Sequence, residues 1–391
     1  ISEYLKTNQI DNSILNLPNE ISEIASIIDV IFRDVYCNGE ESSDLIDLIE
    51  LMLKSQIKVK EPILNDSQLK YLDMKLKHLE NLPQPEQRMP EWYEFRNNRL
   101  TASDLWYIAN WNDAKVHDIL KKKCGVEQAY KPGLAILHGI KFEPVATKIY
   151  ERRNNVEITE FGCLPHSIIP FFGASPDGIC SINSKNKNYV GRMLEIKCPK
   201  SRVITGFIPE VYQAQIQGQL EVCDLEYCDF LECQFLCYNS KEEYFNDYYV
   251  NTDDSIDYSR TKLGNEKGAI LEIYDRVNKC YDYKYLDKFS NIKELEDWEE
   301  PFVDKIIDSD NLEYSGTTLW YLNKISIVLV KRDQYWFSTN FQNIQRFWNM
   351  VEDARINGIP DKKKKNTSID MSQFTGSVSK SNDIVLDFSE N

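Results

Sequence analysis

The stretch that decides the fold reads GASPDGICSINSKNKNYVGRMLEIKCPK and covers residues 173–200. Asp177 lies here in a turn rich in glycine and proline, and Glu195 and Lys197 bracket one isoleucine eighteen positions further on. Side chains alternate between the two faces of a strand, so we expect Glu195 and Lys197 to point to one side while Ile196 points into the core. The turn could bring Asp177 alongside them.

These residue types suit a particular chemistry. Two carboxylates that converge at a strand end form a hard, oxygen-rich site, which favours Mg²⁺ or Mn²⁺. A lysine beside a metal-bound water can orient that water and offset phosphate charge. The pattern therefore favours phosphodiester hydrolysis. The alternative is a surface strand with an ordinary Glu–Lys pair, because a bare Glu-x-Lys occurs by chance in most proteins.

A helix expected at YQAQIQGQLEV (212–222) offers further polar groups. Tyr212, Gln215 and Gln219 lie three and four positions apart, so they are neighbours on the surface of a helix. A glutamine there could hold a nucleophilic water or a substrate phosphate. A solvated, glutamine-rich helix face is the alternative.

Glu143 lies beside an apolar helical stripe in LHGIKFEPVATKIYERR, directly before Pro144. Helices tolerate proline in the first turn or at a kink, so Glu143 is near a special point of the backbone. From these residues alone, a helix cap or an ordinary surface ion pair is the simpler explanation. His138 is expected to pack or cap, since one histidine is no metal site.

Composition limits the protein's class and partners. The net charge of −16 argues against a protein that coats nucleic acid without specificity. The charge is uneven, because residues 86–232 hold 18 Lys and Arg against 19 Asp and Glu, which leaves −15 for the rest of the chain. A near-neutral centre with acidic flanks is compatible with a local DNA groove.

The ten cysteines are scattered, without a CxxC pair or zinc spacing, so we expect reduced and mostly buried thiols. The apolar runs are too short to cross a bilayer, and the first residues lack the pattern of a signal peptide. These features predict an intracellular protein. The sequence starts at Ile1, so an initiating methionine is expected upstream.

The composition also predicts a division of the chain. Residues 1–80 are expected to form an acidic helical domain, and the proline-rich segment 81–90 a linker. Residues 91–358 mix strands and helices, with a strong helix expected at 341–357. Residues 359–391 are rich in Lys, Ser, Asn and Asp and are expected to form a disordered tail.

Taken in order, five motifs resemble the lambda exonuclease family, also called the YqaJ-type viral recombinase family, of the PD-(D/E)XK nuclease superfamily. The order and spacing match over about residues 88–237, with the helix at 341–357 added. The motifs are EWYEFRNNRLTAS (91–103), HGIKFEPVA (138–146), GASPDG (173–178), LEIKCP (194–199) and YQAQIQGQL (212–220). The resemblance implies an α/β fold with a restriction-endonuclease-like core, in which helices flank a central mixed sheet.

The resemblance also implies residue roles. Asp177 and Glu195 would ligate two divalent ions, Mg²⁺ or in its place Mn²⁺, and the main-chain carbonyl of Ile196 would be a further ligand. Lys197 would orient and activate the attacking water. Glu143 would complete the metal site, through water or a second ion.

The remaining implied roles concern DNA. Gln215 would position the water or the scissile phosphate. Arg96 and Ser103 would bind the 5′-terminal phosphate, with Thr101 and Tyr212 nearby on the DNA. This is physically reasonable, because LTASD resembles a helix start with Thr101 or Ser103 as N-cap, and free N–H groups at a helix start attract anions. A plain cap with Arg96 in a surface ion pair is the alternative.

The function implied is a metal-dependent DNA exonuclease that digests linear duplex 5′→3′ and leaves 3′ single strands for recombination, replication or repair. A structure- or end-directed endonuclease and a non-catalytic DNA- or partner-binding scaffold are the alternatives. The family suggests a single-strand annealing protein as partner and leaves a homo-oligomer open. If the source is viral, the host cytoplasm or nucleus is expected.

Overall fold

The computed structural model describes residues 61–85, 89–126 and 133–360. The helices expected within residues 1–60 and the tail expected from residue 361 lie outside the described residues. Within the described residues no helix is both long enough and apolar enough to cross a bilayer. The nine cysteines described there are free thiols, six of them buried, as the sequence predicts.

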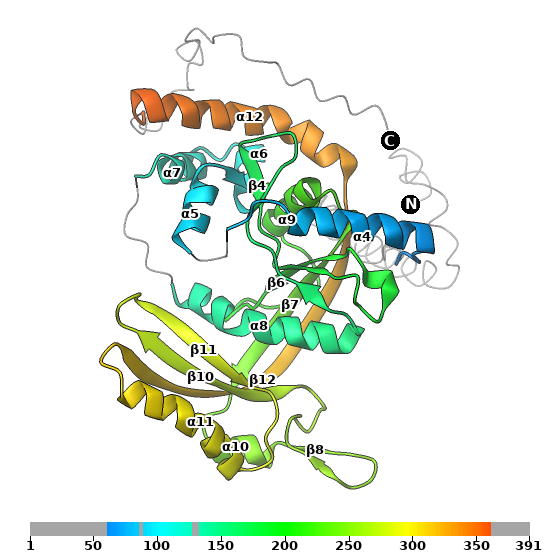
Figure 1. Cartoon of the computed structure of the whole chain (residues 1–391), viewed down its shortest axis with the longest axis vertical. Helices are drawn as coiled ribbons and strands as arrows, with labels where there is room; N and C mark the ends of the chain where they lie inside the picture. The colour runs from blue at the N-terminus through cyan, green and yellow to red at the C-terminus, as the bar shows by residue number, and fades with distance from the viewer. Residues whose placement is uncertain (1–60, 86–88, 127–132, 361–391) are drawn as a thin grey trace, which may run out of the picture.

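A mixed seven-stranded sheet forms the centre of the molecule (Figure 1). Only one pair of neighbouring strands in it, β6 and β7, is parallel, because a helix connects them; the other pairs are antiparallel. The strands, in order across the sheet, are β11 (Cys280–Leu286), β10 (Lys267–Asp275), β12 (Leu312–Lys331), β7 (Tyr227–Cys237), β6 (Met193–Lys197), β5 (Gly178–Cys180) and β2 (Ile158–Thr159).

Two long helices cover opposite faces of β6. On one face, α8 (Leu134–Asn154) packs Phe142 against Leu194 and Ile196. On the other face, α9 (Glu210–Cys223) packs Ile216 in a second core cluster. The alternation predicted for this strand is therefore observed, and Glu195 faces α9 rather than the α8 core.

A second layer on the α9 side carries the other predicted motifs. A three-stranded sheet of β1 (Leu100–Thr101), β4 (Phe172–Ala174) and β3 (Leu164–Pro165) lies there. The helices of this layer are α4 (Asp66–Glu80), α5 (Pro90–Asn97), the 3₁₀ turn η2 (Ala102–Asp104), α6 (Leu105–Ala109), α7 (Asp113–Lys123) and α12 (Gln334–Asn357). The short 3₁₀ turn η3 (Lys187–Tyr189) precedes β6.

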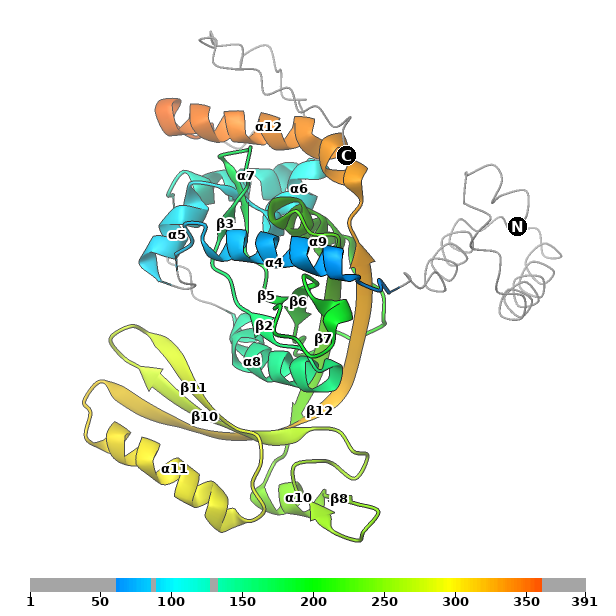
Figure 2. The same cartoon turned by 45° about the vertical axis from the view of Figure 1, so that its right-hand side comes forward.

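A lobe at the end of the molecule opposite α12 extends the sheet (Figure 2). It contains β10, β11 and the first part of β12, covered by the amphipathic helix α11 (Ile292–Ile307). The lobe also contains α10 (Lys241–Asn246) and the hairpin of β8 (Tyr249–Val250) and β9 (Ile256–Asp257). β12 spans both parts, because its first half pairs with β10 and its second half with β7.

The expected α/β fold, with a central mixed sheet and flanking helices, is confirmed. One helix is longer than expected: α12 starts at residue 334 rather than 341, because the Asp333 side chain accepts the N–H groups of Tyr335 and Trp336 and starts the helix. In α4, Leu76 and Leu79 join the same core as Leu105. The division of the chain into domains stays a prediction.

Candidate functional site

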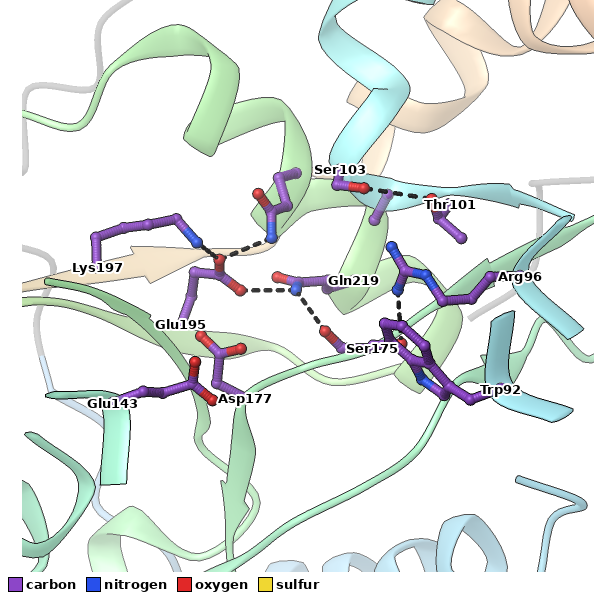
Figure 3. Close-up of a pocket in the computed structure, with 12 residues that line it drawn as sticks. Trp92, Arg96, Thr101, Ser103, Glu143, Ser175, Asp177, Glu195, Lys197 and Gln219 are labelled. Atoms are coloured by element: carbon purple, nitrogen blue, oxygen red, sulfur yellow. Dashed lines mark hydrogen bonds and ion pairs between the residues drawn. The ribbon is translucent and has the colours of Figure 1, made fainter. Parts of the chain in front are cut away.

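One cavity of about 220 Å³ gathers most of the predicted site residues (Figure 3). It lies between β6, α9, the start of β5 and the segment from α5 to η2. Nine residues named from the sequence line it: Arg96, Thr101, Ser103, Glu143, Asp177, Glu195, Lys197, Gln215 and Gln219. Segments far apart in the chain therefore meet at one place.

The acidic end of the cavity holds three carboxylates from three elements. Glu143 comes from α8, Asp177 from the turn between β4 and β5, and Glu195 from β6; the three face one another in Figure 3. Burial raises the pKa of Asp177 well above its usual range, and the charges of Glu195 and Glu143 raise it further. The Ile196 N–H donates to Asp177 Oδ2 at 2.6 Å, which fixes the turn against β6.

Glu195 is fully buried and each of its oxygens is bonded. Gln215 Nε2 donates to Oε1 at 2.7 Å, and Gln219 Nε2 donates to Oε2 at 2.7 Å. Lys197 Nζ also contacts Oε1. The carboxylate is thus held in one orientation by its strand neighbour and by two glutamines one helical turn apart.

Lys197 keeps its charge in this site. Burial lowers its pKa, but the carboxylates of Glu195 and Asp177 raise it by more, so the pKa of Lys197 lies above that of a free lysine. Its ammonium lies 5.1 Å from the ring centre of Tyr212. A permanently charged lysine can orient a water and offset negative charge, but it does not take up a proton.

The donor set fits a hard divalent cation by its chemistry. Three carboxylates share the acidic end, and their mutual effect on Asp177 is what a bound cation would relieve. Among the described residues, however, no three His, Cys, Asp or Glu side chains stand at ready-made metal-ligand spacing. Here the Lys197 ammonium and the two glutamine amides occupy the oxygens of Glu195.

The other end of the cavity is suited to an anion. Arg96 Nη1 donates to Ser175 Oγ at 3.0 Å, and the guanidinium stacks on Trp92 at 4.4 Å. The hydroxyls of Thr101 and Ser103 lie 3.3 Å apart at the start of η2. Arginine and hydroxyl groups in this arrangement match the oxygens of a phosphate.

The cap expected at LTASD differs in detail. Thr101 is the N-cap of η2, but its side chain makes no capping bond. Its hydroxyl instead donates to Asp104 Oδ2 at 3.2 Å, because η2 is only a single 3₁₀ turn and Asp104 lies within reach. Ser103 lies inside η2 and is not a cap.

Two predicted residues lie outside the lining of the cavity. Tyr212 packs on Phe230 with ring centres 5.5 Å apart and lies beneath Lys197. Ile196 is buried in the α8 core, and its N–H, as described above, donates to Asp177. The roles of Tyr212 on DNA and of the Ile196 carbonyl stay predictions.

Sequence reasoning gave no role to Trp92, Ala102 and Ser175, which line the cavity, and it named Gln219 only as one of the helix glutamines that could hold a water or a phosphate. Ser175 stands two positions before Asp177 in the quoted GASPDG turn, and that proximity is a signal that could have found it. Gln219 stands one helical turn after Gln215, on the same side of α9. No motif spacing in the sequence points to Trp92, which lies on the same short helix as Arg96.

Residues 91–226 match the model of the YqaJ-like viral recombinase domain. This segment holds every motif that carried the resemblance. Residues 91–226 are thus similar to the YqaJ-like viral recombinase domain. The lobe, which lies within residues 238–330, and helix α4 are both outside the matched segment.

A curated relative extends the likeness beyond the YqaJ-like domain. An uncharacterized protein of Acanthamoeba polyphaga mimivirus is 31% identical over 300 residues, which are 70% of this chain and 54% of the relative. The chain thus spans about half the length of that relative.

Solved structures of exonucleases are more distant from the chain. The alkaline exonuclease LHK-Exo of Laribacter hongkongensis is 17% identical, with 68% of this chain and 94% of that chain covered, at a TM-score of 0.38. A phage-related exonuclease from Haemophilus somnus 129PT is 11% identical, with 65% and 94% covered, at a TM-score of 0.35.

Proposed function

We propose that this chain is a divalent-metal-dependent DNA exonuclease that digests linear duplex from 5′-phosphorylated ends in the 5′→3′ direction. The observation that carries the proposal is the single cavity of about 220 Å³ in which three carboxylates and Lys197 lie at one end and Arg96 with Ser175 at the other. The YqaJ-like viral recombinase domain supports a role on DNA ends.

The anion end would hold the terminal 5′-phosphate. Arg96 would bind it through charge-assisted hydrogen bonds, and the Thr101, Ser103 and Ser175 hydroxyls would complete its coordination. Trp92 keeps the guanidinium of Arg96 in place by stacking. A phosphate fixed here places the next phosphodiester near the acidic end.

At the acidic end, Glu143, Asp177 and Glu195 would hold the divalent ions. A bound Mg²⁺ or Mn²⁺ would supply Lewis-acid stabilisation of the attacking and leaving oxygens. Lys197 would orient the attacking water through its ammonium, and Gln215 would hold the water or a phosphate oxygen. Water would add to phosphorus as the bond to the 3′ oxygen of the first nucleotide breaks.

Cleavage of the bond between phosphorus and the 3′ oxygen allows digestion to repeat. The leaving 3′ oxygen gains a proton, and the phosphate stays on the second nucleotide. Each cycle therefore produces a new 5′-phosphate of the kind that the anion end binds. Because the 5′-phosphate would bind at the anion end and hydrolysis would occur at the acidic end, digestion would proceed from 5′ to 3′.

Digestion of end-labelled linear duplex, with and without a 5′-phosphate, in Mg²⁺ or in chelator tests the proposal. We expect mononucleotide release only with metal and faster release from phosphorylated ends. Glu195→Gln should lower the rate by about 100-fold or more, because it removes a charge from the site that holds the metal. DNA binding should be largely retained.

Arg96→Met separates an exonuclease from an endonuclease. An exonuclease should lose its preference for 5′-phosphorylated ends, whereas an endonuclease should be nearly indifferent to the change. Metal-independent cleavage, or full activity of Glu195→Gln, would contradict the proposed site. Complete inactivity of the wild-type chain on every end would favour a binding scaffold. An annealing partner, a homo-oligomer and a viral host compartment stay predictions.

A further inference from the structure

The two ends of the cavity are joined by one buried side chain. Gln219 on α9 is only 1% exposed, and its single amide nitrogen makes two bonds. Nε2 donates to Glu195 Oε2 at 2.7 Å and to the main-chain oxygen of Ser175 at 3.2 Å. Ser175 in turn accepts from Arg96 through its hydroxyl. Arg96 is thus connected to Glu195 by hydrogen bonds through two residues, Ser175 and Gln219.

The orientation of the Gln219 amide follows from its partners. A carboxylate and a carbonyl oxygen both need donors, so the nitrogen must face them, and a reversed amide would set oxygen against oxygen. Gln219 Oε1 is buried and has no hydrogen-bond partner among the described residues. Because Gln219 lines the cavity, this oxygen can accept a bond from a water or a substrate group there.

Another glutamine of α9 shows what a purely structural role looks like. Gln217 is also buried, at 3% exposure, but it does not line the cavity. Its Nε2 donates to the Lys331 oxygen at 3.0 Å, and its Oε1 accepts the Asp333 N–H at 2.7 Å. Gln217 therefore ties α9 to the junction of β12 and α12, while Gln219 ties the two ends of the cavity together.

We propose that Gln219 is a positioning residue that sets the separation between the phosphate-binding group of Arg96 and Ser175 and the carboxylate of Glu195. The inference rests on the proposed function. That separation decides which phosphodiester reaches the acidic end when the 5′-phosphate is bound. Gln219 thus makes the cut fall after one nucleotide and couples end recognition to hydrolysis.

The variant Gln219→Met in the full chain tests this, because methionine keeps the length of the side chain without the hydrogen bonds. With Mg²⁺ and 5′-phosphorylated duplex, we expect a mixture of mono- and dinucleotides in place of mononucleotides. The rate preference for 5′-phosphate over 5′-hydroxyl ends should fall about fivefold or more. The matched variant Gln217→Met should lower stability but keep product length and end preference.

A second readout does not depend on hydrolysis. The anisotropy of labelled duplex is measured with and without Ca²⁺. The comparison shows how much the ion strengthens the binding preference for a 5′-phosphorylated end. If the two ends of the cavity are coupled, Ca²⁺ should clearly strengthen the binding preference of the wild-type chain for a 5′-phosphate. In Gln219→Met this Ca²⁺ effect should be about fivefold smaller. A wild-type chain that shows the coupling but cuts nothing would sink the proposed function alone.

Two outcomes overturn the inference on Gln219. One is a Gln219→Met chain with wild-type product length, end preference and Ca²⁺ coupling. The other is a Gln217→Met chain that changes all three to the same degree, since general loosening of α9 would then explain the effect. Absence of Ca²⁺ coupling in the wild-type chain likewise contradicts it.

Discussion

At the scale of single residues, the acidic end of the cavity is a place where function opposes stability. Asp177 has a raised pKa because it is buried beside Glu195 and Glu143, so its charge is unfavourable without a cation. Proteins commonly hold such destabilising groups at functional sites. The same residues that would bind metal should therefore weaken the metal-free protein.

Asp177→Asn tests this directly. Asparagine keeps an oxygen for the Ile196 N–H but removes one charge. In chelator we expect the free energy of unfolding to rise by about 1–2 kcal/mol, and Mg²⁺ should add less stability than in the wild type. Urea unfolding with and without Mg²⁺ measures both, and metal-dependent hydrolysis should be lost.

Asp229→Asn is the matched control for that variant. Asp229 is 1% exposed and more deeply buried than Asp177, and it accepts from Tyr150 at 2.6 Å and pairs with the buried Arg192 at 3.4 Å. Its neutralisation leaves the buried Arg192 only the exposed Glu61, at 3.8 Å, as an ion-pair partner among the described residues, so we expect a destabilisation of about 3 kcal/mol. Equal effects of the two variants would contradict the explanation given for Asp177.

Lys123 gives a pH prediction at the same scale. It is 2% exposed beneath α5, where its Nζ donates to the Arg96 oxygen at 2.8 Å. Burial lowers its pKa from 10.5 to about 8, although Asp104 opposes the shift. The unfolded chain therefore binds more protons between these two values, and the contribution of Lys123 to stability rises with pH through that window.

Lys123→Met removes this titration. Near pH 7 the wild type carries the full cost of a buried ammonium and the variant does not; near pH 10.5 that cost has gone. The stability of the variant relative to the wild type should thus fall by up to about 3 kcal/mol from pH 7.5 to 10.5. Urea unfolding over a pH series checks it, and a constant difference would refute it.

Single residues also show how much of the candidate site could be predicted from the sequence. The alternation of β6 predicted that Glu195 and Lys197 share a side, and a strand admits no other arrangement. Trp92 could not be assigned because its role depends on which distant segment Arg96 approaches. The run Lys121–Lys123 gives no sign of which lysine is buried, since that depends on the packing of α5 over α7.

At the scale of elements, α9 depends on a close approach to the phosphate-binding segment. A Cβ built at Gly218 would lie 2.2 Å from Leu105 Cδ1 and 3.2 Å from the Ala102 Cβ. Glycine at this position therefore allows η2 and α6 to rest directly on α9, which places Thr101 and Ser103 at the cavity.

Gly218→Ala should destabilise the protein by about 1–3 kcal/mol through overpacking, and it should weaken end recognition as η2 shifts. Gly139→Ala in α8 is the control, because nothing lies within 4 Å of its Cβ position. There the gain in helix propensity should stabilise by about 0.5–1 kcal/mol. Thermal unfolding compares the two, and the same sign for both would contradict this packing argument.

Most elements of residues 91–237 were predictable by type, but their limits were not. The composition of VEITEFGCLP (156–165) is typical of a strand, yet β2 and β3 within it hold two residues each and belong to different sheets. Such short strands are defined by their partners rather than by their own pattern. The helix at α12 began earlier than expected because apolar periodicity fades before its first turn, where only the Asp333 cap marks the start.

At the scale of the whole molecule, β12 links the lobe to the part of the sheet that contains β7 and β6. It is a single strand of 20 residues, Leu312–Lys331, paired with β10 on one stretch and with β7 on the next (Figure 1). The side chain of Tyr285 on β11 also bonds the Lys141 oxygen of α8 at 3.1 Å. Neither part can lose its sheet without disturbing the other.

We therefore expect the lobe and the nuclease core to unfold together. Urea transitions followed by far-ultraviolet circular dichroism, by tryptophan fluorescence and by hydrogen exchange of β10 and β6 peptides should coincide. Two separated transitions, with β10 exchanging long before β6, would show that the lobe is an independent unit.

The overall fold class could be read from the order of motifs, whereas the lobe could not. Residues after 238 contain apolar and aromatic runs typical of strands, such as GAILEIYDRV and KISIVLVKR, but nothing in them indicates that they extend the central sheet. That extension depends on β12, whose partners on β7 lie more than eighty positions away in the chain.

The register of β7 and β12 has a consequence for the history of the protein. Cys237 on β7 and Trp320 on β12 are paired. The chain between these two residues therefore leaves β7 and enters β12 at the same level of the sheet. A shorter ancestor would need only a tight turn to join these two residues, and the intervening piece can have grown there by successive insertions. Descendants of that ancestor should differ in length mainly between these two positions.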